Sequence, residues 1–351
     1  HIVIGEAEEI ILDIINGRYS EQIIHGRPVK NLDELPFINY DLLVNAKHMN
    51  IIPIMTSRGC PFNCNFCTVT KVFGRAFRQQ SADRIISEIK HAKQYFNKST
   101  FFFYDDNFTT NKQFSNDIIN RFIKEKLNIT WTAQVRADIA NDDALLHKIF
   151  KAGCDRVFIG FESIDERVLK SYGKSQTRHD IEKAIKKIHE CGINIHGMFM
   201  VGEDNDIFES IDITVDFAIE NHIDTVQFMI LTPFPGTQIY EKLNSENRLL
   251  HHNWDFFNGM HVVHYPKSIS PLQLQLGVIN AHRKFYSVSR TLLDLLYFIF
   301  NITSDALVWN FSRAKRYDLN NLYLKAGAKL IIIEYIRSHN NYIDYLQNSF
   351  N

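Results

Sequence analysis

The chain of 351 residues has few cysteines, almost no surplus charge and no long apolar run. Five cysteines are too few, and an odd number, for a secreted disulfide scaffold, so we expect a reducing compartment such as the cytoplasm. The formal net charge of −1 offers no field to attract nucleic acid or an anionic membrane surface. The most apolar stretch, residues 292–300, contains Asp294 and is too short to span a bilayer, which favours a buried or interfacial helix.

Short apolar runs alternate with amphipathic stretches through the middle of the chain. The runs are rich in Val, Ile, Phe and Thr, as buried parallel strands are, and cover residues 51–56, 100–104, 129–135, 156–161, 193–201 and 225–231. The stretches between them begin at helix-capping residues such as Ser81 and Thr177, and end at Gly153 and Gly192. Six repeated strand–helix units predict an α/β fold, namely a partial, TIM-like (β/α)6 barrel of parallel strands. A doubly wound open sheet is the alternative, and in both folds ligands gather at the carboxyl ends of the strands.

Three regions are expected along the chain. Residues 1–50 contain one strand-like run, one helix over residues 7–16 and a loop, which are too little for a core. We interpret them as the remnant of a preceding domain plus a linker, and the first residue, His1, favours a fragment truncated at its N-terminus. Residues 51–250 form the βα core. Residues 251–351 lose this rhythm, and their helical periodicity predicts a mostly helical extension.

Three of the cysteines, Cys60, Cys64 and Cys67, fall within eight residues directly after the first predicted strand. A cuboidal iron–sulfur cluster normally takes four protein thiolates, so three would leave one iron open to an outside ligand. Structural zinc is the alternative, but it needs four ligands. The nearest downstream histidine, His91, lies inside a predicted helix, so zinc would require a distant fourth ligand.

The pattern Cys60-x-x-x-Cys64-x-Phe66-Cys67 resembles the signature of the radical S-adenosylmethionine (radical SAM) enzymes, and the resemblance covers residues 51–249. It implies that the three cysteines hold a 4Fe–4S cluster whose fourth iron binds S-adenosylmethionine. It also implies that an electron from the cluster would yield a 5′-deoxyadenosyl radical, and that Phe66 would lie beside the adenine. It further implies a small-molecule substrate and a low-potential electron donor such as a ferredoxin or flavodoxin.

Polar residues at other strand ends match positions that contact S-adenosylmethionine in this family. Asp105, with Asp106 beside it, would hold the methionyl amine, although a helix-capping role is the alternative. Arg136 would pair with the methionyl carboxylate, or else form a structural ion pair. Glu162, in a segment resembling Gly-x-Glu-Ser, would reach the ribose hydroxyls, with an ordinary loop acid as the alternative.

The first residues resemble the tail of a cobalamin-binding domain, through the run Val3-Ile4-Gly5-Glu6-Ala7-Glu8. Residues 68–75 also resemble the cobalamin-dependent branch of the family. The resemblance implies that the full-length protein binds cobalamin and methylates an unactivated carbon. A radical methylthiotransferase and a non-catalytic iron–sulfur protein for electron transfer or sensing are the alternatives.

Overall fold

The computed structural model describes residues 1–290, 292, 296 and 319–350. Its central feature is a six-stranded parallel sheet with the strand order β10-β9-β8-β7-β6-β3. The six strands are β3 (Ile52–Ile54), β6 (Thr100–Phe103), β7 (Thr130–Val135), β8 (Cys154–Glu162), β9 (Asn194–Val201) and β10 (Thr225–Ile230). The helices that join them are α3 (Ala82–Phe96), α4 (Lys112–Lys124), α5 (Asp143–Lys151), α7 (Arg178–Glu190) and α8 (Phe208–Glu220).

The strand order decides between the two predicted architectures. Each strand follows its predecessor in space as it does in the chain, with no point at which the order reverses. Right-handed crossovers between such strands place every connecting helix on the same face. A doubly wound sheet would instead need a reversal of strand order. The α/β fold of the partial-barrel type is therefore confirmed, together with the mostly helical C-terminal region.

The predicted helix signals act as expected. Ser81 Oγ accepts a hydrogen bond from Arg84 N at 3.1 Å and caps α3. Thr177 and Asp180 form a reciprocal capping box at the start of α7. Local side-chain chemistry thus sets where these helices begin.

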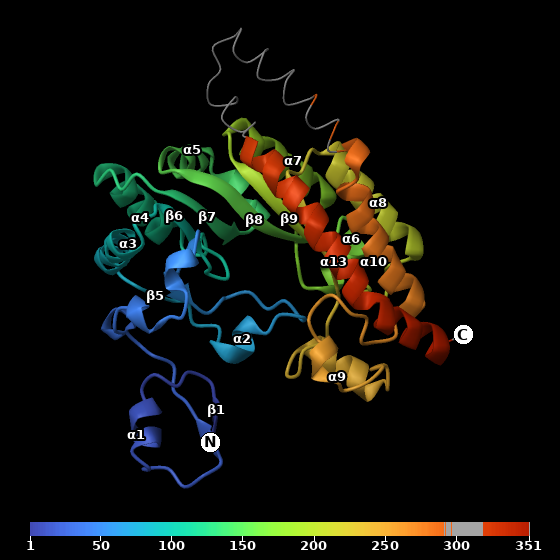
Figure 1. Cartoon of the computed structure of the whole chain (residues 1–351), viewed down its shortest axis with the longest axis horizontal. Helices are drawn as coiled ribbons and strands as arrows, with labels where there is room; N and C mark the ends of the chain where they lie inside the picture. Colours follow the sequence, from blue (N-terminus) through green and yellow to red (C-terminus); the bar gives the residue numbers. More distant parts are fainter. Residues whose placement is uncertain (291, 293–295, 297–318, 351) are drawn as a thin grey trace. The chain divides into compact units, whose positions relative to one another are not determined.

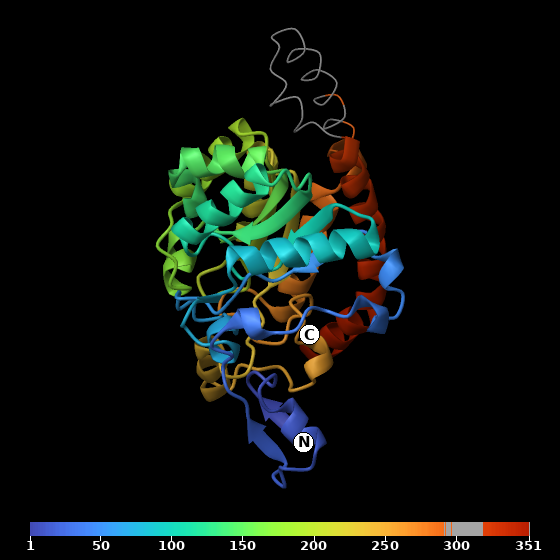
Figure 2. The same cartoon turned by 90° about the vertical axis from the view of Figure 1, so that its left-hand side faces the viewer.

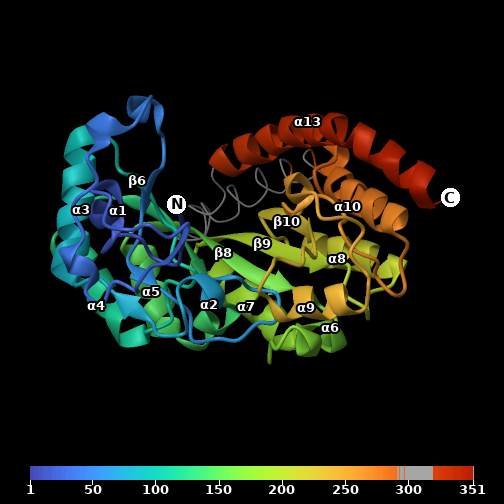
Figure 3. The same ribbon diagram turned by 90° about the horizontal axis from the view of Figure 1, so that it is seen from below.

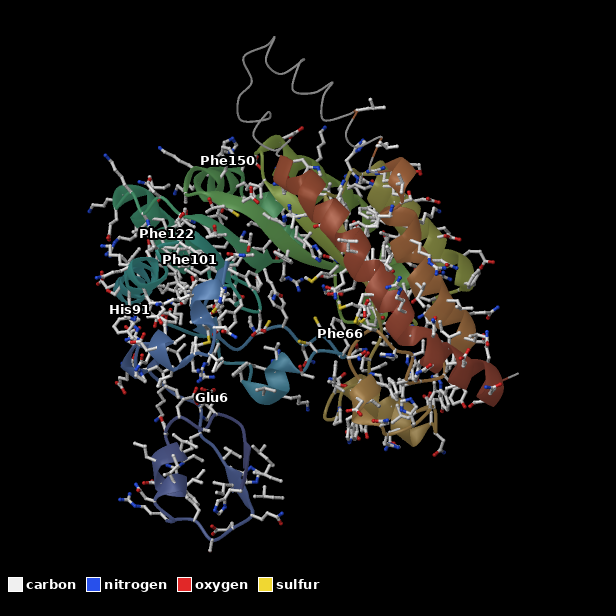
Figure 4. All side chains as sticks on the ribbon, in the orientation of Figure 1. Glu6, Phe66, His91, Phe101, Phe122 and Phe150 are labelled. Carbon is white, nitrogen blue, oxygen red and sulfur yellow. The ribbon has the colours of Figure 1, made fainter. Side chains whose placement is uncertain are left out.

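Contacts divide the chain into two compact units. The first comprises residues 1–63, 67–134 and 151–154, and contains β3, β6, β7, α3 and α4. Its core is aromatic: Trp131 is 1% exposed, donates from Nε1 to Ala152 O at 3.0 Å, and contacts the rings of Phe103 and Phe122. Figure 4 labels Phe101 and Phe122 among the side chains of this unit.

A small module at the N-terminus departs from the prediction. It holds two short parallel strands, β1 (Ile2–Ile4) and β2 (Ile23–His25), where one was expected. The helix α1 (Ile11–Ile15) is also shorter than the predicted residues 7–16 and buries none of its residues. Figure 2 shows these elements grouped together. The hydrophobic pattern alone overestimated the helix because packing supplies most helical stability in short segments.

The second unit comprises residues 64–66, 135–150 and 155–351. It contains β8, β9, β10, the short helices α6 (Glu166–Ser171) and α9 (Gln238–Ser245), and the long helices α10 (Pro271–Phe285) and α13 (Leu319–Phe350). Figures 1 and 3 show α13 running beside α10, which itself packs against α8 and β10. The hydroxyl of Tyr286, after α10, donates to Val226 O at 2.8 Å and accepts from Val226 N at 2.9 Å.

The predicted helix at residues 292–300 lies largely outside the described residues. Within the described part of the chain, no helix combines the length and apolar character that a bilayer crossing requires.

We expect Trp131→Ala to lower the free energy of unfolding by about 3–5 kcal/mol, because it removes a large buried side chain. Urea unfolding followed by circular dichroism measures this change. Trp254→Ala is the matched control, since Trp254 is 53% exposed and its loss should cost no more than ~1 kcal/mol. Equal losses in the two variants would contradict the assignment of Trp131 to the core.

Candidate functional site

The three clustered cysteines lie on the loop that follows β3. Cys60, Cys64 and Cys67 are each partly buried, and none is in a disulfide. A short antiparallel strand pair leads into the loop and consists of β4 (Ser57–Arg58) and β5 (Arg78–Gln79). Gly59 then turns with φ of +88°, and a Cβ there would lie 2.4 Å from Ala76 O. Only glycine therefore permits this close backbone approach directly before Cys60.

The middle of the loop, residues 64–66, is anchored within the second unit. Asn65 Nδ2 donates to Ser171 O at 2.7 Å, and Asn65 O accepts from Ile239 N at 3.2 Å. The Phe66 ring meets the buried Tyr172 ring edge-on, with centroids 5.0 Å apart. Phe66 thus has a fixed orientation set by an apolar cluster, whose buried members are Val168, Tyr172, Met200, Leu231, Ile239 and Leu243.

The described side chains offer no arrangement for a single metal ion. Across residues 1–290 and 319–350, no group of three or more His, Cys, Asp or Glu side chains is arranged to hold one metal ion. A structural zinc would need four such ligands around one point. A 4Fe–4S cube takes each thiolate at a different iron, so its ligands can lie farther apart. The zinc alternative therefore finds no support among the described residues.

Asp105 lies just beyond the end of β6 and is 2% exposed. Its Oδ1 accepts hydrogen bonds from Thr56 N at 2.9 Å, from Ser57 N, and from Ser57 Oγ at 2.7 Å. Its Oδ2 is buried and has no hydrogen-bond partner in the protein. The carboxylate thus holds the backbone that leads to Cys60 and keeps one oxygen available. Asp106, next to it, is exposed.

Glu162 ends β8 in a left-handed conformation, with φ of +62°. A β-bulge between Gly160 and Glu162 accompanies it, and the carboxylate turns back toward Gly160. Lys174 Nζ donates to Glu162 Oε1 at 2.8 Å and to Gly160 O at 2.7 Å. A non-glycine residue in this region stores backbone strain, which the bulge and the bond to Lys174 help to hold. The predicted contact of Glu162 with the ribose hydroxyls stays a prediction.

Arg136 directly follows β7, and its Nε lies 3.7 Å from Asp138 Oδ2. It lines a pocket of the second unit together with Gln176, Asp180 and Lys183. This placement is compatible with a structural ion pair and with an anion ligand, so its predicted role stays a prediction.

Several residues beside these positions were not found from the sequence. Lys174 neutralises Glu162, and Tyr172 supports Phe66. Asp206 follows β9 and accepts hydrogen bonds from Gly202 N at 2.9 Å and Glu203 N at 3.0 Å, while burial raises its pKa to about 7. Lys174 lies 12 positions after Glu162, and Tyr172 lies far from Phe66 along the chain, so no local pattern could have found them. Asp206 closely follows Gly202 and Glu203, but a single acid after a strand is not a distinctive signal.

The pH dependence of stability should report on Asp105. Burial raises the pKa of Asp105 to about 6, although hydrogen bonds from Ser57 and Thr56 oppose the rise. Between about pH 4, near the unfolded pKa, and pH 6 the folded chain therefore binds more protons than the unfolded chain. The stability that Asp105 contributes is complete below this window and is lost as pH rises through it.

We expect Asp105→Asn to remove this loss, because asparagine cannot ionise but still offers an acceptor oxygen. Urea unfolding from about pH 4 to pH 7 measures the difference in unfolding free energy between wild type and variant. Wild type should lose stability relative to the variant as the pH rises to about 6, and the difference should stay constant above that pH. A difference that is constant with pH would contradict the buried, raised-pKa state.

Comparison with known proteins agrees with this geometry. The family described as "Radical SAM superfamily" matches residues 54–252, more than half of the chain. The chain is 34% identical to "Uncharacterized methyltransferase PH0819" of Pyrococcus horikoshii, over 76% of this chain and 58% of that protein. It is 31% identical to the bacteriochlorophyllide d C-8(2)-methyltransferase of Chlorobaculum tepidum, over 84% of this chain and 69% of that protein. The chain thus spans less than two thirds of the first of these relatives.

Among solved structures, the cobalamin-dependent S-adenosylmethionine radical enzyme OxsB shares the fold. Its TM-score is 0.64 at 18% identity, over 96% of this chain and 64% of that chain. The family match confirms the predicted family, whose cofactors are a 4Fe–4S cluster and S-adenosylmethionine. The chain belongs to the radical SAM superfamily.

Proposed function

We propose that Cys60, Cys64 and Cys67 hold a 4Fe–4S cluster with which this chain cleaves S-adenosylmethionine reductively. The observation that carries the proposal is a loop of three thiols, none in a disulfide, that follows β3 and β4 in a chain that matches the family over residues 54–252. When bound, the cluster supplies the electron that breaks a sulfur–carbon bond of S-adenosylmethionine and releases a 5′-deoxyadenosyl radical.

The protein's own residues would bind and orient S-adenosylmethionine. We propose that Asp105 Oδ2 accepts a hydrogen bond from the methionyl amine. This oxygen is buried and has no hydrogen-bond partner in the protein, whereas Oδ1 already accepts hydrogen bonds from the backbone. Glu162 would accept from the ribose hydroxyls, with its carboxylate oriented by Lys174 Nζ, 2.8 Å from Oε1. Phe66, braced by Tyr172, would lie against the adenine. Arg136 would pair with the methionyl carboxylate.

The substrate and electron source follow from the same chemistry. A radical enzyme needs a low-potential donor, so we propose a ferredoxin or flavodoxin in the cytoplasm, where thiolate ligands stay reduced. The near-neutral net charge favours a small-molecule substrate over nucleic acid.

We further propose that the whole protein is a cobalamin-dependent methylase of an unactivated carbon. The names of the relatives in Pyrococcus horikoshii and Chlorobaculum tepidum support methylation, and the fold shared with OxsB supports cobalamin. The boundaries near residues 50 and 250 stay a prediction. The N-terminal module exposes large apolar side chains that the rest of a preceding domain would cover, namely Ile2, Ile4, Leu12, Ile15 and Ile23.

We expect the triple variant Cys60→Ala, Cys64→Ala and Cys67→Ala to lose the cluster, because each change removes one thiolate. Anaerobic reconstitution followed by iron analysis measures binding, and 5′-deoxyadenosine formed from S-adenosylmethionine with a strong reductant measures turnover. Cys191→Ala is the matched control, since Cys191 lies outside the loop, after α7. Equal iron in wild type and triple variant would disprove the site.

We expect the complete gene, expressed anaerobically with cobalamin supplied, to yield protein with the visible absorbance of cobalamin. Absence of that absorbance in protein that still holds its iron–sulfur cluster would reject the cobalamin-dependent branch while leaving the radical enzyme proposal intact.

A further inference from the structure

Glu6, in the N-terminal module, is a carboxylate almost completely removed from water, at 5% exposed. Its oxygens accept hydrogen bonds from Arg58 Nη1 at 2.6 Å, from Arg78 Nη1 at 3.0 Å and Nη2, and from Val29 N at 3.2 Å. Figure 4 labels Glu6 at the edge of the module formed by β1 and α1. Since Val29, Arg58 and Arg78 all belong to the first unit, these bonds are internal to one compact part of the chain.

The two arginines lie opposite each other. Arg58 in β4 pairs in register with Arg78 in β5, and both side chains are nearly buried, at 11% and 12% exposed. Like charges directly opposite on paired strands repel, and the low dielectric of a buried site strengthens the repulsion. Glu6 bridges both guanidinium groups and offsets it. Glu8, which is more exposed, adds a second contact to Arg58 at 2.6 Å.

The ionised state of Glu6 is the one that the surroundings favour. Burial alone raises the pKa of Glu6, but hydrogen bonds from Arg78 and Arg58 outweigh this effect and hold it below its usual value. Neutralising the side chain would remove the negative charge that bridges the two guanidinium groups, which is costly even though Glu8 still contacts Arg58. Movement of one arginine away from the other would relieve the remaining repulsion.

Movement of Arg58 bears directly on the cysteine loop. Arg58 is followed by Gly59, whose backbone lies close to Ala76 O. This close approach restricts how far the backbone can adjust between Arg58 and Cys60. Thr56 and Ser57, just before Arg58, are held by Asp105. A carboxylate on each side thus constrains the three residues leading into the loop, and Glu6 supplies one of the two constraints.

The alternative is a plainer role, in which Glu6 only connects the N-terminal module to the rest of its unit. That role predicts lower thermal stability of the chain with an unchanged cysteine loop.

We propose that Glu6 is a positioning residue that sets the place of Cys60 through Arg58, so that the N-terminal module tunes the iron–sulfur cluster. The inference rests on the proposed function in one respect, namely that Cys60 is a cluster ligand. It adds that a residue outside the radical SAM core, at the N-terminal end of the chain, controls how firmly the cluster is held.

The test compares Glu6→Gln with Asp13→Asn in the full 351-residue chain. Asp13 is in the same module and forms an exposed ion pair with Arg18, so Asp13→Asn controls for general effects on the module. Hydrogen exchange of the apo-chain reports on the amides of residues 56–60. Iron loss to a chelator, together with the electron paramagnetic resonance spectrum and midpoint potential of the reduced cluster, reports on the reconstituted protein.

We expect Glu6→Gln to speed exchange at residues 56–60, shift the spectrum or potential, and hasten iron loss by roughly tenfold or more, as loss of a ligand-supporting contact does. Asp13→Asn should change none of these. A Glu6→Gln chain that unfolds at a lower temperature but keeps wild-type hydrogen exchange, spectrum and iron retention would overturn the inference. Glu6 would then only connect the N-terminal module to its unit.

Failure of the proposed function can be distinguished from failure of this inference. Wild-type protein that holds no more iron than the triple cysteine variant would refute the proposed function. Hydrogen exchange at residues 56–60 in the apo-chain would still test the positioning role of Glu6. If Glu6→Gln fails to fold by circular dichroism, Glu6→Asp preserves the charge with a shorter reach. Wild-type exchange at residues 56–60 in folded Glu6→Asp, with wild-type iron retention, would equally overturn the inference.

Discussion

A parallel sheet imposes one constraint on everything else in this chain: each strand must be joined to the next by a crossover that returns to the same edge. Here the strands follow one another in chain order, and right-handed crossovers place the connecting helices on one face. The loops after the strands are therefore the places where polar residues can accumulate without disturbing the core. The cysteines follow β3, Asp105 follows β6, and Glu162 ends β8.

Within the first unit, buried charge provides rigidity where the chain leaves regular structure. The regular structure that leads into the loop carrying Cys60 is short, namely the two-residue pairing of β4 with β5. Asp105 compensates by accepting backbone donors from Thr56 and Ser57, and Glu6 by bridging Arg58 and Arg78. Burying a carboxylate is costly unless its partners are in place. The same cost makes the arrangement specific, because alternative positions of the loop would leave the charges unpaired.

The second unit supports its part of the loop by apolar contact instead. Phe66 packs on Tyr172 within a cluster drawn from α6, α9 and neighbouring strands, and hydrogen bonds from Asn65 fix the backbone beside it. At the end of β8, Glu162 combines a left-handed backbone with a neutralising lysine. Strain is retained there because the bulge, the bond to Lys174 and the packing of β8 together over-determine the conformation.

The sequence by itself determined the six strands of the central sheet, the helix starts at Ser81 and Thr177 and the cysteine motif, because these depend on neighbours within a few residues. Apolar runs, the capping residues Ser81 and Thr177, and the spacing of Cys60, Cys64 and Cys67 are all local patterns. It misjudged α1 and missed β2, since so short a segment takes its structure from packing. Only the tertiary structure decided which groups meet: Asp105 with Thr56 across 49 positions, Glu6 with Arg78 across 72, and Asn65 with Ser171 across 106. Such pairings arise when crossovers and the core bring distant segments together, and no spacing along the chain encodes them.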